Sequence, residues 1–379
     1  MSAAGYPRSQ KGDTVFVAWR DLRVARGRFV LIGSVVALIT LLVGFLAGLT
    51  GGLAAQNVSA VLALPGDRLV LQAPDAGTRA SFSQSVLDDE TVSAWQHAEG
   101  VAQVTPIGIV QGRAARADAS DAGGSATGVA LFGIPGDAAP STVTALAPRA
   151  DDHAGLSAGA AKALDVAVGD HITVAGTSFV VDTIGGDAWY SHTPVVALTP
   201  AAWADTDRRL GGDGDATVLA VSGSPDWDAT AARTHTTAAL AVQSLTALET
   251  FTSEVGSLAL MIAMLFGVSA LVVGAFFTVW TMQRAGDIAV LKALGASTGS
   301  LVRDALGQAF VVLVVGIGVG IGVVAVLGSL AGGALPFLLS PLTTVLPATI
   351  MAALGLAGAT VALRTVTHAD PLTALGSSR

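Results

Sequence analysis

The chain of 379 residues contains no cysteine. Disulfide bonds, thiolate catalysis and cysteine-ligated metal centres are therefore excluded. Charged residues make up only 13% of the chain, about half of the share that is usual in soluble domains. Hydrophobic residues make up 52%, and the mean hydropathy is +0.64. The composition therefore indicates a membrane protein with a sizeable water-exposed part, not an ordinary soluble enzyme.

The sequence also lacks the motifs of common catalytic sites. No G-x-x-x-x-G-K-[ST] segment occurs, so the chain has no Walker A loop to bind nucleotide phosphates. The six histidines are scattered without metal-ligand spacing, and no Ser/His/Asp order or carboxylate pair indicates catalysis. We expect no catalytic residue, no metal site, no permanently bound cofactor and no nucleic-acid partner.

Four long apolar runs are present, at residues 29–49, 255–279, 309–330 and 345–363. The first has 21 residues without a charge, which spans about 31 Å as a helix and is enough to cross a bilayer core of about 30 Å. This run is too long for the apolar part of a typical cleaved signal peptide. Pro336, Pro341 and Pro347 predict a sharp break before the fourth run.

The charges predict how the chain is oriented in the membrane. Residues 1–28, the segment 280–308 and the C-terminal tail carry 11 of the 20 Lys and Arg residues but few acids. The segment 51–253 carries nine Lys and Arg against 22 Asp and Glu. Because cytoplasmic loops are enriched in Lys and Arg, we expect both termini in the cytoplasm and the long insert outside.

The expected fold is a multi-pass protein of the cell membrane, with four transmembrane helices and a mixed α/β extracytoplasmic domain between the first and the second. The expected boundaries are a cytoplasmic amphipathic helix 1–28, spans at 29–50, 253–281, 301–331 and 345–364, the domain 51–252, a cytoplasmic helix 282–300, an outer loop 332–344 and a tail 365–379.

Local patterns predict several elements of the insert. Residues 68–72 alternate as a half-buried strand does, and residues 171–174 and 178–181 flank a turn, which is typical of a hairpin. Residues 195–198 form a further candidate strand. Helices are expected at 156–166, after Thr199-Pro200, and over 231–251. The polar segment 113–127 is expected to be a loop.

Two segments on the expected cytoplasmic side are amphipathic. Val15, Trp19 and Leu22 recur at helical spacing, which predicts a helix on the inner leaflet or a solvated lead-in to the first span. Residues 283–300 place Ile288, Leu291 and Leu294 on one apolar face. Such a short helix can dock on a partner protein or can be only a connector.

The segment RAGDIAVLKALGAS, residues 284–297, resembles the signature R-x-x-E-I-x-x-L-K-A-L-G-A of the FtsX/MacB-type ABC permeases, with Asp287 in place of the more common Glu. The order of one span, a large insert and three spans is similar as well. The resemblance implies a type VII ABC transporter, in which a permease homodimer recruits two copies of a separate ATPase. It also implies a coupling helix that contacts the ATPase through Arg284, Asp287, Ile288, Leu291, Lys292 and Leu294.

The N-terminal third is similar to the HrtB-type haem-efflux permeases and the related DevC group. The similarity rests on Arg20-Asp21, Arg28-Phe29, Gly48-Leu49-Thr50, Gly52-Leu53 and Asn57-x-Ser59-Ala60. It implies efflux and detoxification of haem. Two alternatives stay open: export of a lipid, a peptide antibiotic or a lipoprotein, or an FtsX-like signalling permease that activates a cell-wall hydrolase.

If haem is the substrate, its iron needs His, Met, Tyr or thiolate ligands, and its propionates need cations or hydrogen-bond donors. Thiolate is not available in this chain. The outer ends of the first two spans offer a set of candidates: Gln56, Asn57, Glu249, Glu254, Met261 and Met264. The alternative is that the methionines fill packing gaps and Glu254 is a solvated helix start.

Gly44, Gly48 and Gly52 follow one another at a spacing of four residues in the first span. A doubled G-x-x-x-G pattern lets two helices approach closely in a membrane. We expect these glycines at the interface of the homodimer, with packing inside one chain as the alternative.

Overall fold

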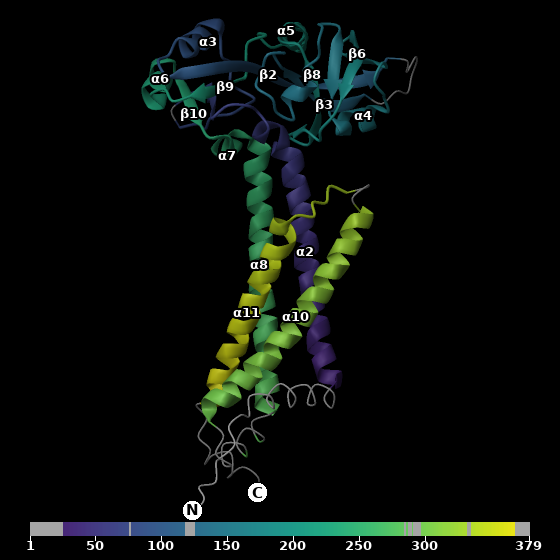
Figure 1. Ribbon diagram of the computed structural model, residues 1–379, viewed down its shortest axis with the longest axis vertical. Helices are drawn as coiled ribbons and strands as arrows, with labels where there is room; N and C mark the ends of the chain where they lie inside the picture. Colours follow the sequence, from purple (N-terminus) through teal and green to yellow (C-terminus); the bar gives the residue numbers. More distant parts are fainter. Residues whose placement is uncertain are drawn as a thin grey trace, which may run out of the picture. The chain divides into compact units, whose positions relative to one another are not determined.

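A computed structural model of the chain describes residues 26–75, 77–117, 126–283, 286, 290, 297–331 and 335–367. The chain divides into two compact units, drawn in Figure 1. One unit comprises residues 1–52 and 258–379, and the other comprises residues 53–257. The amphipathic helix expected around Val15, Trp19 and Leu22 lies outside the described residues.

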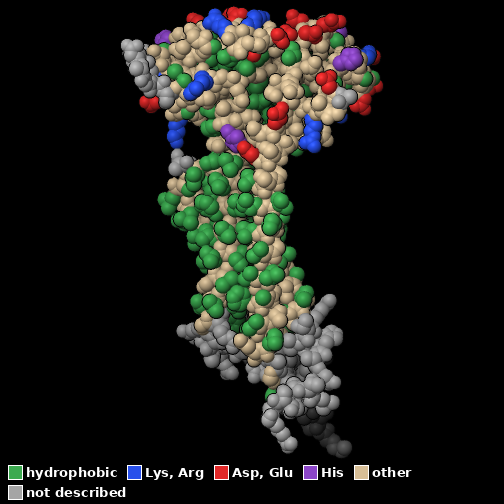
Figure 2. All heavy atoms as spheres, turned by 180° about the vertical axis from the view of Figure 1, so that it is seen from behind, with side chains coloured by type: hydrophobic (Ala, Val, Ile, Leu, Met, Phe, Trp, Pro, Cys, Tyr) green, Lys and Arg blue, Asp and Glu red, His purple; other side chains and the backbone are tan. Residues whose placement is uncertain are grey.

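Within the described part of the chain, four helices are long and apolar enough to cross a membrane. They are α2 (Arg26–Leu62), α8 (Glu249–Gln283), α10 (Thr298–Ala331) and α11 (Pro341–Thr367). The surface of the helical unit is mostly hydrophobic, and the charged side chains gather on the other unit (Figure 2). The predicted fold class is confirmed: four apolar helices with a mixed α/β domain between the first and the second.

The break predicted between the last two helices is present. Residues 335–340 are not helical, and Pro341 is the first residue of α11, where its missing N–H is not needed. Pro347 lies inside the helix. The hydroxyl of Thr343 donates to the carbonyl of Leu338 at 2.7 Å and so ties the loop to the helix start.

Helix α10 packs closely against α2 through two glycines. A Cβ atom on Gly316 would lie 2.9 Å from the carbonyl oxygen of Gly33, and one on Gly320 would lie 2.8 Å from that of Ala37. Because lipid supplies no hydrophobic drive between helices, such close backbone contact is a main source of their attraction.

Gly44, Gly48 and Gly52 are used within the chain. A Cβ atom on Gly52 would lie 1.9 Å from the carbonyl oxygen of Pro336, and one on Gly48 would lie 2.3 Å from the ring of Phe337. Gly44 faces Val324 of α10. These contacts agree with the alternative, packing inside one chain, and the dimer interface on these glycines stays a prediction.

The second unit is built on a ten-stranded mixed sheet with the order β10-β1-β9-β2-β3-β8-β4-β6-β5, in which β7 pairs with β8 and β2 also pairs with β5. The strands are β1 (Arg68–Gln72), β2 (Val101–Arg116), β3 (Thr127–Gly133), β4 (His153–Leu156), β5 (His171–Val174), β6 (Thr177–Ile184), β7 (Trp189–Tyr190), β8 (Thr193–Leu198), β9 (Val218–Gly223) and β10 (Thr236–Ala239). The short helices are α3 (Asp89–Gln96), α4 (Ala158–Leu164), α5 (Pro200–Leu210), α6 (Trp227–Arg233) and α7 (Ala241–Ser244), with 3₁₀ turns η1 (Thr144–Leu146) and η2 (Leu245–Ala247).

Local sequence signals set several of these elements. Strand β1, the β5–β6 hairpin and strand β8 lie where the sequence predicts them. Ser157 caps α4 by accepting from the N–H of Ala160, and Thr199 caps α5 by accepting from the N–H of Ala202. Short polar side chains at these positions satisfy helix N–H groups that have no partner in the helix.

The helix predicted over 231–251 is wrong. The segment contains α6, β10, α7 and η2 before α8 begins. The β-branched residues Thr236 and Thr237 favour a strand, and β10 pairs with β1 along four residues.

The loop predicted at 113–127 is wrong for its first residues, because β2 continues to Arg116. Residues 118–125 lie outside the described part of the chain. The last residues of β2 pair with a strand on each side. Ala114 is opposite both Thr127 of β3 and Val174 of β5. This pairing outweighs the weak strand preference of the alanines.

One tryptophan shows how the core of the domain is packed. Trp203 of α5 is 4% exposed and lies on Gly108 of β2 and Gly133 of β3, where a Cβ atom would come within 2.3 Å and 2.8 Å of its ring. Its indole N–H donates to the carbonyl of Leu131 at 3.1 Å. The ring therefore joins the helix to two neighbouring strands.

Candidate functional site at the turn–helix junction

The two-residue turn between β7 and β8 contacts helix α2 through its backbone. Ser191 and His192 form the turn, with φ values of 45° and 64°. Two successive residues of positive φ are typical of the tight turns that match the twist of a hairpin. Their N–H groups donate to the carbonyls of Asn57 at 2.9 Å and Gln56 at 3.0 Å. The tip of the hairpin is therefore fixed on α2.

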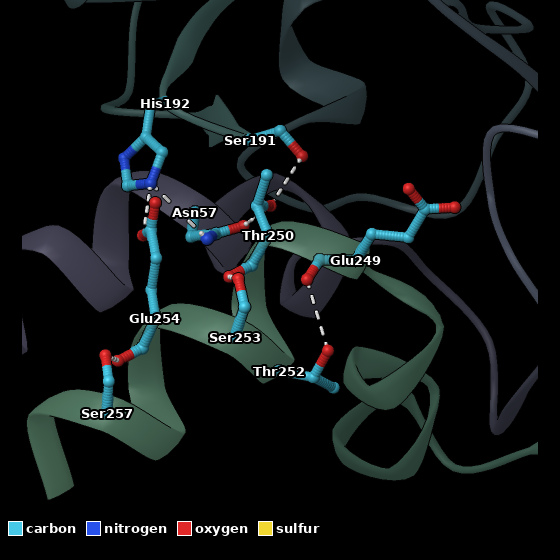
Figure 3. A network of polar contacts seen from close by, with 9 residues as sticks. All are labelled: Asn57, Ser191, His192, Glu249, Thr250, Thr252, Ser253, Glu254 and Ser257. Atoms are coloured by element: carbon cyan, nitrogen blue, oxygen red, sulfur yellow. Dashed lines mark hydrogen bonds and ion pairs between the residues drawn. The ribbon is translucent and has the colours of Figure 1, made fainter.

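The side chain of His192 contacts helix α8. Its Nε2 lies 2.7 Å from Oε2 of Glu254, and the two side chains are 29% and 43% exposed (Figure 3). An ionised carboxylate can only accept, so Nε2 carries the proton and donates it to Oε2. One turn thus contacts α2 with its backbone and α8 with a side chain.

One buried amide and a partly buried hydroxyl connect the two helices next to this pair. Asn57 is 1% exposed, and its Oδ1 accepts from the hydroxyl of Thr250 at 3.0 Å. The Thr250 hydroxyl also lies 3.3 Å from that of Ser191, and Nδ2 of Asn57 lies 3.4 Å from Nε2 of His192. We call Asn57, Ser191, His192, Thr250 and Glu254 the junction (Figure 3). The bond from Thr250 pairs the buried Oδ1 of Asn57, which offsets part of the cost of its desolvation.

The hairpin behind the turn is anchored by Ser59 and Tyr190. The hydroxyl of Ser59 accepts from the backbone N–H of Trp189 at 2.9 Å. The ring of Tyr190 meets those of Phe82 and Phe132 edge to face at centroid distances of 6.2 Å and 5.8 Å. Burial, and to a smaller extent the negative charge of Glu249, raises the pKa of the Tyr190 hydroxyl.

The chemistry available at the junction is that of a carboxylate with one free oxygen. No described residue donates a hydrogen bond or forms an ion pair with Oε1 of Glu254. No group of three His, Cys, Asp or Glu residues that could hold a metal ion occurs among the described residues. The junction can therefore bind a cationic or partly coordinated group, but it does not offer the ligand set of a structural metal ion.

Residues 259–371 match the model of a protein family described as FtsX-like permease, C-terminal. This segment of the chain is an FtsX-like permease domain. The chain is the membrane-embedded, non-catalytic permease subunit of an ABC transporter, and such a permease works with a separate ATPase. This FtsX-like permease is a membrane protein with four candidate spans.

Two relatives match nearly the whole permease. A Staphylococcus haemolyticus protein named HrtB, a hemin transport system permease, is 24% identical over 371 residues, which cover 95% of this chain and 99% of that protein. An uncharacterized ABC transporter permease of Mycobacterium tuberculosis is 26% identical over 380 residues, covering 96% of this chain and 99% of that protein. The periplasmic region of MacB from Actinobacillus actinomycetemcomitans superposes with a TM-score of 0.35 at 12% identity, over 50% of this chain and 95% of that region.

The structure brings together some of the haem candidates predicted for this permease. Asn57 and Glu254 belong to the junction, and Gln56 contributes its backbone carbonyl. Glu249 points away from His192 (Figure 3). Its Oε1 accepts from the hydroxyl of Ser81 at 3.3 Å. Met261 and Met264 lie on α8 in the helical unit, with exposed fractions of 54% and 66%.

The sequence does not single out His192 as a partner of Glu254, since the two lie 62 positions apart and no spacing rule relates them. One signal for it is present in the sequence. His192 lies between two strand-like segments, at Tyr190-Ser191-His192-Thr193, which is where a hairpin turn is expected. The six coupling residues Arg284, Asp287, Ile288, Leu291, Lys292 and Leu294 lie outside the described residues, so their role stays a prediction.

Proposed function

We propose that this permease is the membrane subunit of a haem-efflux system, working as a homodimer with two copies of its ATPase. The observation that carries the proposal is the partly exposed carboxylate of Glu254, which has one free oxygen beside His192. Haem supplies four nitrogen ligands to its iron, so one or two protein ligands are enough. The name of the Staphylococcus relative supports the same substrate.

The proposed orientation puts both termini and the coupling segment in the cytoplasm. Lys and Arg are concentrated in those segments, while the 51–253 insert has more than twice as many acids as bases. ATP binding to the partner would then be transmitted through residues 284–296 to the spans, and the cargo would leave on the side of the α/β domain. Replacing Leu291 with Asp should abolish co-purification of the ATPase, because the charge falls on the apolar face of the coupling helix.

A haemin titration of the detergent-purified permease tests the substrate. Saturable binding with a shifted Soret band is expected for the unmodified chain. Glu254→Gln should weaken it, while Glu249→Gln is the matched control, since Glu249 starts the same helix but points away from His192. Met261→Leu, which keeps the size of the side chain, tests the thioether separately. Absence of saturable binding to the unmodified chain would overturn the haem proposal.

A second candidate, export of a lipid or another apolar cargo, is favoured by a groove in the helical unit. The groove has a volume of about 430 Å³ and lies between α2 and α10. It is lined by Phe29, Val30, Gly33, Ser34, Ala37, Val311, Val312, Val315, Gly316 and Val319. An apolar cargo predicts that bulky substitution at Ala37 blocks transport while Glu254→Gln leaves it unchanged.

A further inference from the structure

The backbone of the β7–β8 turn fixes the direction of the His192 side chain. Both N–H groups of the turn are bonded to α2, and both turn residues have positive φ. These backbone bonds do not depend on which side chain stands at position 192. The imidazole is therefore presented to α8 from a turn that stays docked when the side chain is changed.

The contact uses only one of the two oxygens of Glu254. Nε2–H donates to Oε2 at 2.7 Å, and no described residue contacts Oε1 with a hydrogen bond or ion pair. A glutamate at a helix surface otherwise has several rotamers of similar energy. The bond to His192 selects one of them and leaves Oε1 without a hydrogen bond from a described residue.

We propose that His192 is a positioning residue that holds Oε2 of Glu254 so that Oε1 is presented to the iron of haem. This inference rests on the proposed function. Ferric haem has a positively charged centre that a carboxylate oxygen can ligate, and a hydrogen bond to the second oxygen orients such a ligand and tunes its basicity. Asn57 holds the first turn of α8 next to this pair, because its Oδ1 accepts from the hydroxyl of Thr250 at 3.0 Å.

The test is a haemin titration of the full-length permease with three substitutions. His192→Ala removes the donor, and His192→Gln offers an amide N–H in its place. The control is His153→Ala, because His153 forms a 2.7 Å pair with Asp152, and its side chain is 32% exposed, close to the value for His192. Affinity and the Soret spectrum of the ferric complex are both recorded, along with the unfolding temperature of each variant.

We expect His192→Ala to weaken haemin binding by about 10- to 100-fold, as is usual when a hydrogen-bond partner of a metal ligand is removed. Its residual spectrum should shift toward that of free haemin, while His192→Gln and His153→Ala should stay near the unmodified chain. Equal affinity and spectra for His192→Ala and the unmodified chain would overturn the role of His192 alone. Failure of the unmodified chain to bind haemin would overturn the proposed function and this inference together.

Discussion

His192 and Glu254 lie 62 positions apart in the chain, yet Nε2 of one is 2.7 Å from Oε2 of the other. The pair joins a turn of the α/β domain to the start of α8. Both side chains remain partly exposed, at 29% and 43%, so solvent screens their attraction. The contact is therefore better suited to orienting a side chain than to stabilising the fold.

A double-mutant cycle with His192→Ala and Glu254→Ala should show this weak coupling. We expect an interaction free energy below about 1 kcal/mol, because partly exposed ion pairs contribute little. Denaturant unfolding of the full chain in detergent, followed by tryptophan fluorescence, measures it. A coupling of several kcal/mol would mean that the pair is mainly structural.

Replacing Asn57 should cost more than breaking that pair. Asn57→Ala removes a buried amide and leaves the half-buried Thr250 hydroxyl without its acceptor, and we expect the domain to lose about 1–3 kcal/mol of unfolding free energy. Gln56→Ala is the control, because Gln56 contributes only its backbone carbonyl to the turn. Similar unfolding curves for the two variants would show that the amide network contributes nothing.

Gly52→Ala should disturb the contact between α2 and the loop before α11. The new Cβ atom would come within 1.9 Å of the Pro336 carbonyl, and overpacking of this kind costs about 1–3 kcal/mol. Gly318→Ala is the control, because no atom lies within 4 Å of its would-be Cβ. Thermal unfolding measures the packing inside one chain, and size-exclusion chromatography measures the oligomeric state. If Gly52→Ala dissociates a dimer without loss of stability, the glycines form an interface between two copies instead.

Tyr190 should resist ionisation in alkaline solution. A Tyr6→Phe variant leaves Tyr190 as the one tyrosine, since the chain has two. Burial raises the pKa of the Tyr190 hydroxyl, so the tyrosinate absorbance should appear well above the usual value of about 10.

The same shift sets the sign of the pH dependence of stability. Above about pH 10 the unfolded chain releases this proton more readily than the folded one, so the unfolding free energy should fall as the pH rises. An absorbance change near the ordinary tyrosine value, in a chain that is still folded, would contradict the burial of this hydroxyl.

Much of the fold follows from short-range patterns. The apolar runs predict the four long helices, and the cap at Thr199-Pro200 predicts the start of α5, because both depend only on neighbouring residues. The helix predicted over 231–251 is wrong for the opposite reason. Its Ala and Leu content favours a helix, but β10 exists because strand β1, more than 160 positions earlier, offers it a partner.

The candidate site was only half predictable. Glu254 and Asn57 stand out because they flank apolar runs, whereas His192 enters the site through a hairpin whose register no local pattern determines. The sequence predicts close contacts at the glycines of α2, but it does not predict which part of the protein makes them. A G-x-x-x-G pattern specifies room for a neighbour and not whether that neighbour is Phe337 of the same chain or a second helix.

The way in which the hairpin turn is attached has a consequence for its evolution. The bonds to α2 are made by the main chain, so they tolerate any residues at 191 and 192 that accept positive φ. The bond to Glu254 needs a side-chain donor at position 192. If Glu254 contacts the cargo as proposed, a single substitution at position 192 would alter cargo binding while the main-chain attachment of the turn is inherited intact.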